Sequence, residues 1–354
     1  MNRFQNAIRR QNKGRPPVWF MRQAGRYHAH YQGLRQTHGF MDLCKKPEVA
    51  CETTMGPIRD FDFDAAILFS DLLFPLEVLG MGLSYEPGPK LEWHLLNKAD
   101  LSRLSAGGES LARSLSYQAD AMALIRKSLP LEKGLIGFVG GPLTLFFYAA
   151  AGSHSGDLKS AHEGMKDGRF EGFCERLEDL LAENMAMQAR AGADTIAMMD
   201  TCAGEITSEL FREKAVPAIR RVLEKFVAKC PNVPVTYYSK NTRRDHWKQL
   251  AGLPIGALGV DWNVDLPAVL EEFGGDYAIQ GNIDPHWLFL PWEELRLNVS
   301  EIYNRVARVN PRKLDGWISG LGHGVLPKTP EENVRNLVKL NHEMFGHWDR
   351  GGRA

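Results

Sequence analysis

Short runs of apolar or β-branched residues recur along the chain, each followed by a polar or glycine-rich turn and then a helical stretch. Runs that are apolar at every position are typical of strands buried on both faces, as in a parallel sheet covered by helices. About eight such units predict an α/β fold, a (β/α)8 TIM barrel rather than an open doubly wound sheet. The runs begin at Val18 (VWFM), Ala65 (AAILF), Leu135 (LIGFV), Thr195 (TIAMM), Val235 (VTYY), Ala257 (ALGVD), Ala278 (AIQGN) and Gly316 (GWISG).

The segments between these runs carry helix signals. In FCERLEDLLAENMAMQARAG the leucines and Met185 fall on one face, and Gly192 stands where a C-cap belongs. Thr329 and Pro330 are expected to be the N-cap and first residue of another helix. The long gap after the run at Ala65, which contains MGLSYEPGPKLEW, is expected to hold a hairpin as well as a helix.

An uncharged stretch from Leu135 to Gly152 raises the question of a membrane span. Its Gly140-Gly141-Pro142 centre would break a spanning helix. We therefore expect a buried strand, a tight loop and the start of a helix, with no membrane insertion.

Composition limits the possible functions. The 354 residues are 44% hydrophobic, enough for one large core, and we expect a single domain over residues 1–354. Lys plus Arg and Asp plus Glu are both 43, so binding of nucleic acid or an anionic membrane by bulk charge is not expected. The five cysteines have no CxxC spacing, which predicts neither a disulfide nor a structural zinc and fits a cytoplasmic protein.

Polar residues follow the predicted strands, where a barrel places its chemistry. In PVWFMRQAGRY, Arg22 and Arg26 have no acid between Arg15 and Asp42 to pair with, which suggests that they await an anion from outside the chain. Each candidate also has a structural interpretation, as a solvated arginine, a helix cap or a core residue. The later candidates are Ser70, Asp71, Tyr148, Asp200, Thr201, Ser239, Lys240, Asp261, Asn282, Asp284 and His323.

Other site chemistries lack their motifs. There is no HExxH, no HxC and no carboxylate cluster for a metal, and GFVGGP is not a phosphate loop. There is also no GxSxG elbow. The remaining groups could bind a polyanion and stabilise one positive charge.

The blocks PVWFMRQAGRY, AAILFSD, GFVGGPLTLFFYAAAG, DTCAG, GVDW, QGNIDP and GLGHGVLPKTP occur in an order that resembles the uroporphyrinogen decarboxylase family. The resemblance implies a (β/α)8 barrel, usually a homodimer, with the active site at the C-terminal ends of the strands. It implies decarboxylation of the four acetate side chains of uroporphyrinogen III to give coproporphyrinogen III, in tetrapyrrole synthesis, with neither metal nor organic cofactor. The substrate-site residues implied by it are Arg22, Gln23, Ala24, Gly25, Arg26, Asp71, Tyr148, Thr201 and His323.

Among these, the resemblance assigns Asp71 to the pyrrole N–H groups, and we expect Asp71, Arg22 and Tyr148 to be catalytic. An ionised Asp71 would stabilise a ring protonated at carbon, so we expect it to stay charged despite burial. The proton donor is open between Tyr148, His323 and a water molecule.

The chain departs from the family pattern at His28-Ala29-His30, where Leu-Pro-Glu is usual, and at Cys202. Two alternatives follow from the resemblance. One is a porphyrinogen-binding paralogue without turnover. The other is a corrinoid-dependent methyltransferase relative, which would need a zinc-binding HxC pair and a later cysteine.

Overall fold

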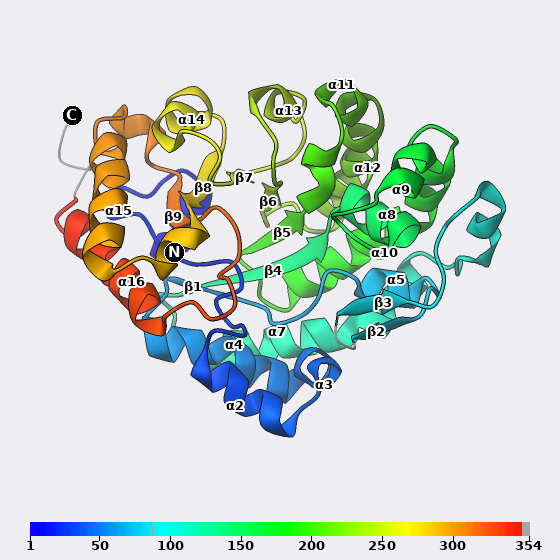
Figure 1. Cartoon of the computed structure of the whole chain (residues 1–354), viewed down its shortest axis with the longest axis horizontal. Helices are drawn as coiled ribbons and strands as arrows, with labels where there is room; N and C mark the ends of the chain where they lie inside the picture. The colour runs from blue at the N-terminus through cyan, green and yellow to red at the C-terminus, as the bar shows by residue number, and fades with distance from the viewer. Residues whose placement is uncertain (86–87, 349–354) are drawn as a thin grey trace.

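The computed structural model describes residues 1–85 and 88–348, and its centre is a curled parallel sheet of seven strands with helices around its outside (Figure 1). The order β1-β4-β5-β6-β7-β8-β9 follows the chain, so consecutive parallel strands are neighbours. The strands are β1 (Ala65–Ile67), β4 (Gly134–Gly140), β5 (Thr195–Met199), β6 (Val235–Tyr238), β7 (Ala257–Gly259), β8 (Ala278–Ile283) and β9 (Trp317–Leu321). Each coincides with one of the predicted apolar runs.

The first predicted run, at Val18, is the exception. Within the described residues it forms an isolated parallel bridge to Ser319, with Trp19 N–H donating to the Ser319 carbonyl at 3.3 Å and Ser319 N–H to the Pro17 carbonyl at 2.9 Å. On its other side, Asp64 N–H donates to the Val18 carbonyl at 2.8 Å, while Val18 N–H donates to the Asp64 carboxylate rather than to a backbone carbonyl. Regular pairing fails here because Pro17 lacks an N–H and a side chain takes the next one.

Helices cover the outer face of the sheet (Figure 1), where α4 contacts β1, α10 contacts β4 and β5, and α14 contacts β8. The α-helices are α1 (Arg3–Ile8), α2 (Ala29–Thr37), α3 (Phe40–Lys45), α4 (Pro47–Phe61), α5 (Phe74–Val78), α6 (Glu109–Ala112), α7 (Ser116–Ser128), α8 (Pro142–Ala151), α9 (Lys159–Gly164), α10 (Arg169–Arg190), α11 (Ser208–Leu210), α12 (Val216–Lys229), α13 (Arg244–Lys248), α14 (Leu266–Phe273), α15 (Trp292–Val306) and α16 (Glu331–Phe345). Short 3₁₀ or π turns are η1 (Lys98–Arg103), η2 (Arg113–Leu115), η3 (Thr201–Glu205), η4 (Phe211–Ala215), η5 (Pro285–Phe289) and η6 (Pro311–Lys313).

The helix predictions hold with one correction. The predicted apolar face of α10 is buried, and Gly192 just beyond it has a φ of 113°, which suits a glycine after a helix end. Thr329 does not cap α16. That helix begins at Glu331, and the Thr329 hydroxyl instead donates to the Leu326 carbonyl at 2.8 Å, within the turn that precedes the helix.

The two remaining segment predictions are confirmed. The hairpin consists of β2 (Leu83–Tyr85) and β3 (Pro89–Leu91), which pair antiparallel. The uncharged stretch divides into β4 and α8, joined at Gly141. Among residues 1–85 and 88–348, no helix has the length and apolar character needed to span a bilayer.

Candidate active site

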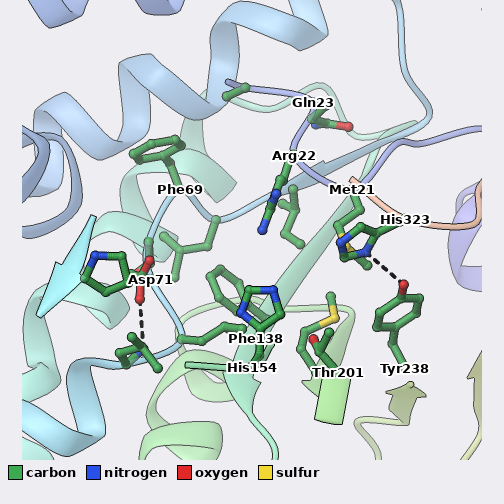
Figure 2. Close-up of a pocket in the computed structure, with 18 of the residues that line it drawn as sticks. Met21, Arg22, Gln23, Phe69, Asp71, Phe138, His154, Thr201, Tyr238 and His323 are labelled. Carbon is green, nitrogen blue, oxygen red and sulfur yellow. Dashed lines mark hydrogen bonds between the residues drawn. The ribbon is translucent and has the colours of Figure 1, made fainter. Parts of the chain in front are cut away.

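A cavity of about 460 Å³ lies at the C-terminal ends of β1, β4, β5, β6 and β9 (Figure 2). It collects most of the residues that the sequence singled out, although they are up to three hundred positions apart in the chain. Its lining is Met21, Arg22, Gln23, Ala24, Arg26, Ile67, Leu68, Phe69, Ser70, Asp71, Leu72, Leu73, Pro89, Phe138, Tyr148, His154, Met199, Thr201, Tyr238 and His323. Of the substrate-site residues that the family resemblance implies, Gly25 is outside this lining. The other candidates outside it, which were suggested by their places after the strands, are Asp200, Ser239, Lys240, Asp261, Asn282 and Asp284.

The loop after Val18 carries both arginines. Arg22 adopts a left-handed backbone with φ of 59°, an unfavourable conformation for a side-chain-bearing residue, and Figure 2 shows its guanidinium reaching into the cavity. Neither Arg22 nor Arg26 forms a side-chain hydrogen bond or ion pair with another described residue, and both are exposed. Two guanidinium groups therefore face the cavity with their donors available for an anion.

Gln23 anchors this loop. Gln23 is 1% exposed and its side-chain amide nitrogen donates to the Ala65 carbonyl at 3.2 Å, while its backbone carbonyl accepts from the Tyr27 hydroxyl at 2.7 Å. These bonds connect the arginine loop to the first strand. Although Gln23 lines the cavity, both of these hydrogen bonds are to other residues of the protein and hold the loop in place.

Asp71 enters the cavity just after β1, and its Oδ1 accepts the backbone N–H of Leu73 at 2.9 Å (Figure 2). Burial raises the pKa of this carboxyl above its ordinary value. Tyr85, the Leu73 N–H and the charge of Arg22 favour the anion without overcoming burial. We expected Asp71 to stay charged despite burial; without substrate, burial outweighs these groups, and no cation of the chain pairs with Asp71 among the described residues.

Tyr148 lies on α8, which a buried aspartate holds in place. Asp200, fully buried at the end of β5, accepts the Thr144 N–H at 2.8 Å and the Tyr237 hydroxyl at 3.1 Å. Gly141 makes this approach possible, since a Cβ there would lie 2.3 Å from the Asp200 carboxyl carbon. The same aspartate precedes Thr201 and thereby fixes Tyr148 and Thr201 relative to one another.

His323 forms a hydrogen bond through Nδ1 to the Tyr238 hydroxyl at 2.9 Å, and that hydroxyl also lies 2.9 Å from the Gly322 carbonyl. Since the carbonyl can only accept, the single phenol proton goes to it, and His323 must carry its proton on Nδ1. Burial, together with the charges of Arg22 and Lys240, lowers the pKa of His323 to about 3. The ring is therefore neutral at physiological pH.

The glycines beside His323 have packing roles. A Cβ at Gly322 would lie 2.3 Å from the Trp262 backbone nitrogen, and one at Gly324 would lie 2.5 Å from Cδ of Arg22. Gly324 therefore leaves the space that the Arg22 side chain needs to enter the cavity.

The histidines that depart from the family pattern are outside the cavity lining. His28 is fully buried, with Nε2 2.7 Å from an Asp60 oxygen, and His30 Nε2 is 2.7 Å from Glu52. Gly56 admits the His30 ring, since a Cβ there would be 2.2 Å from it. The two histidines thus fasten the end of the arginine loop to α4.

Sequence reasoning missed two polar residues of the cavity. Tyr238 was visible only as the last residue of an apolar run, and nothing in the pattern distinguished it from core tyrosines. His154 lies in the loop after α8, in a serine- and glycine-rich stretch without periodicity. Its nearness to Tyr148 in the sequence was the available signal.

No group of three His, Cys, Asp or Glu side chains suited to a metal ion occurs in the part of the chain that the structure describes.

A family profile described as "Uroporphyrinogen decarboxylase (URO-D)" matches residues 1–344. The chain belongs to the uroporphyrinogen decarboxylase family. A protein named uroporphyrinogen decarboxylase from Roseiflexus sp. (strain RS-1) is 35% identical over 353 residues, covering 97% of this chain and 98% of the relative. Another of the same name from Chloroflexus aggregans is 36% identical, covering 96% and 94%.

Among solved structures, a methyltransferase from Methanosarcina mazei superposes with a TM-score of 0.76 over 97% of this chain and 98% of its own. At 19% sequence identity this likeness concerns the fold alone. It agrees with the curled parallel sheet of this member of the uroporphyrinogen decarboxylase family.

Proposed function

We propose that this protein decarboxylates uroporphyrinogen, converting its four acetate side chains to methyl groups and giving coproporphyrinogen and carbon dioxide. Support comes from the family, from relatives named for this activity that match nearly the whole chain, and from the cavity. The observation that carries the proposal is the presence in one cavity of unpaired Arg22 and Arg26 with Asp71, a carboxyl that lacks a cationic partner among the described residues.

The arginines would bind the substrate's carboxylates. An octacarboxylate macrocycle is a polyanion, and guanidinium groups bind carboxylates through two parallel N–H bonds. Because Arg22 and Arg26 are exposed at the cavity, the carboxylates can reach them without first breaking an ion pair. Thr201 and the neutral His323, which both line the cavity, would complete the binding surface.

Asp71 would act on the macrocycle's charge. Decarboxylation of a pyrrole acetate requires the ring to be protonated at carbon, so that it can accept the electron pair left by carbon dioxide. An anionic Asp71 in a desolvated cavity stabilises this cation more than the neutral ring, which is the condition for raising the rate. The pyrrole N–H groups supply the donors that the chain itself does not, and they favour the anion.

The neutral state of His323 bears on the proton donor. With its pKa lowered to about 3, this imidazole lacks the second ring proton that an imidazolium would give near neutral pH, and its remaining Nδ1–H donates to Tyr238. Tyr148 is the remaining candidate among the predicted side chains.

We further propose that the segment at Val18 closes the sheet into a (β/α)8 barrel as its eighth member, in one domain over residues 1–354. The backbone hydrogen bonds of this segment to Ser319 and Asp64, on its two sides, support this reading. A homodimer and a cytoplasmic location are expected from the family resemblance. Sedimentation of the purified protein would test the homodimer.

The test of function is anaerobic incubation of the purified protein, without added metal or cofactor, with freshly reduced uroporphyrinogen III. The products are then oxidised and separated by carboxylate number. Successive loss of carboxylates from eight to four is expected. Return of only the eight-carboxylate species, with binding demonstrated, would favour the porphyrinogen-binding paralogue.

A further inference from the structure

Tyr148 and His154 form a close pair at the rim of the cavity. The phenol oxygen and His154 Nδ1 are 2.5 Å apart, and the ring centroids are 5.6 Å apart. Within the described residues neither side chain forms another hydrogen bond, and both line the cavity. His154 is exposed while Tyr148 is half-buried, and both line the cavity, so the pair leads from the solvent into the cavity.

The chemistry needs such a route. If the proposed function holds, each acetate carboxylate is replaced by a hydrogen, so every carbon dioxide released consumes one proton from solution. A macrocycle that reacts four times therefore requires the donor to be recharged repeatedly. His323 is poorly placed for this, because burial, which is the largest cause of its lowered pKa, persists with substrate and its Nδ1–H donates to Tyr238; arginine side chains do not release their protons in proteins.

We propose that His154 relays protons from the solvent to Tyr148, and that Tyr148 passes them to the substrate. This inference rests on the proposed decarboxylase activity. His154 acts through Tyr148 and touches no reacting atom. When the imidazole is protonated, its Nδ1–H donates to the phenol oxygen, which leaves the phenol O–H directed at the substrate.

The proton transfer balances as follows. The Tyr148 O–H bond breaks while a C–H bond forms at the pyrrole carbon beside the acetate-bearing carbon, using a π-electron pair of the ring. The phenolate takes the Nδ1 proton of His154, which becomes neutral and recovers a proton from water. The bond to carbon dioxide then breaks and its electron pair neutralises the ring. The recharged Tyr148 gives a second proton to the exocyclic methylene, and its phenolate takes back the proton of the ring carbon, so that one proton from solution is consumed for each carbon dioxide.

A cationic hydrogen-bond partner would make the Tyr148 phenol a stronger acid. Burial raises the pKa of Tyr148 to about 12, so alone it is a weak acid near neutral pH. A hydrogen bond from a protonated imidazole stabilises the phenolate and lowers the cost of giving up the proton.

Substrate binding should also raise the pKa of His154 and favour its protonated form. Burial, Lys240 and Arg22 lower the pKa of His154, whereas Glu205 raises it. The carboxylates of a bound polyanion oppose the two cations, so His154 should gain its proton when the substrate arrives. The groups that bear on it are Tyr148 on α8, Arg22 on the arginine loop, Glu205 in η3, Lys240 after β6 and His323 after β9.

The test compares wild type with His154→Gln, His154→Ala and a matched control, His162→Gln. The His162 ring packs on Phe147 and lies outside the cavity lining. Both His154 variants should lose about a hundred-fold in kcat with little change in KM, the lower end of what a proton-transfer group contributes, because Tyr148 itself remains. Imidazole added to His154→Ala should restore kcat in proportion to its concentration, and His162→Gln should resemble wild type.

The pH profile separates a relay from a mere contact. Wild-type kcat should fall as pH rises through the pKa of His154 in the complex, and this step should be absent in His154→Gln. A His154→Gln enzyme with wild-type kcat at every pH would overturn the relay. So would a loss in His154→Ala that imidazole does not restore. If wild type itself released no carbon dioxide, the proposed function would fail first, and the relay with it.

Discussion

Two aspartates at opposite ends of β1 differ in the hydrogen bonds and ion pairs that the protein provides to their carboxylates. Asp64, just before the strand, accepts both Arg15 nitrogens at 2.7 and 2.9 Å and the Val18 N–H at 2.8 Å. Asp71, just after it, accepts a single backbone N–H from Leu73. The neighbouring segment shows the same contrast, because Arg15 before Val18 is paired and Arg22 after it is not.

The pKa shifts follow this difference. Burial favours the neutral form of both carboxyls, but His342 and Arg15 outweigh it at Asp64 and lower the pKa to about 2, whereas the pKa of Asp71 is raised. A buried carboxylate that is paired with cations and hydrogen-bond donors of the protein stabilises the fold. A buried carboxylate without such partners costs stability and is available to a ligand.

The largest effect is expected from Asp71→Asn. Turnover should fall by about a hundred- to a thousand-fold, a typical loss when one charge-stabilising group is removed from a transition state. Stability at neutral pH should hold or rise, because a carboxyl whose pKa is raised by folding loses its contribution as pH increases through that pKa. Steady-state kinetics and urea unfolding measure both. Asp64→Asn is the matched control, and equal turnover losses in the two variants would show that the two aspartates do not differ in their effect on catalysis.

Arg22→Ala and Arg26→Ala should each weaken substrate binding by about ten-fold or more, the usual range for a charged hydrogen bond. Added salt should reduce wild-type affinity more than that of either variant. Arg212→Ala, an exposed arginine paired with its neighbour Glu213, provides the control. An unchanged KM in both cavity variants would exclude these arginines as the carboxylate site.

Asp64→Asn should lower the free energy of unfolding by about 2 kcal/mol at neutral pH, given a pKa near 2 in place of 3.8. The sign follows from the lowered pKa. The stabilisation is complete above the unfolded value and is lost as pH falls through about 2. The difference between variant and wild type should therefore shrink in acid, which chemical denaturation at several pH values would measure. A difference in unfolding free energy that did not change with pH would show that the ionisation of Asp64 is not its cause.

Tyr238→Phe should have the smallest effect, a few-fold rise in KM. It removes the two neutral hydrogen bonds of the Tyr238 hydroxyl, each worth about 1 kcal/mol, and leaves His323 free to change its tautomer. The tautomer is read from imidazole nitrogen NMR shifts. A wild-type ring protonated on Nε2 would contradict our assignment.

The parts of this molecule that were predictable are those in which one residue's environment follows from its neighbours in the chain. Unbroken apolar runs revealed the seven strands, and their ends located Asp71, Thr201 and His323. The irregularity at Val18 was hidden, because it depends on an aspartate side chain taking a backbone N–H from forty-six positions away.

The same limit applies to the site. The packing that requires Gly324 is with Arg22, some three hundred residues distant, so the sequence alone could not explain that glycine. His154 joins the cavity through a loop without periodicity. The raised pKa of Asp71 reflects burial that only the fold creates.

The contrast between the two aspartates is best tested by counting the protons released when substrate binds. Calorimetric titration of wild type and Asp71→Asn with uroporphyrinogen, at mildly acidic pH in buffers of different ionisation enthalpy, measures this number. If substrate N–H groups satisfy Asp71, wild type should release more protons than the variant, because its carboxyl ionises on binding. Equal release by both proteins would show that Asp71 does not change its charge state with substrate, and would contradict the account.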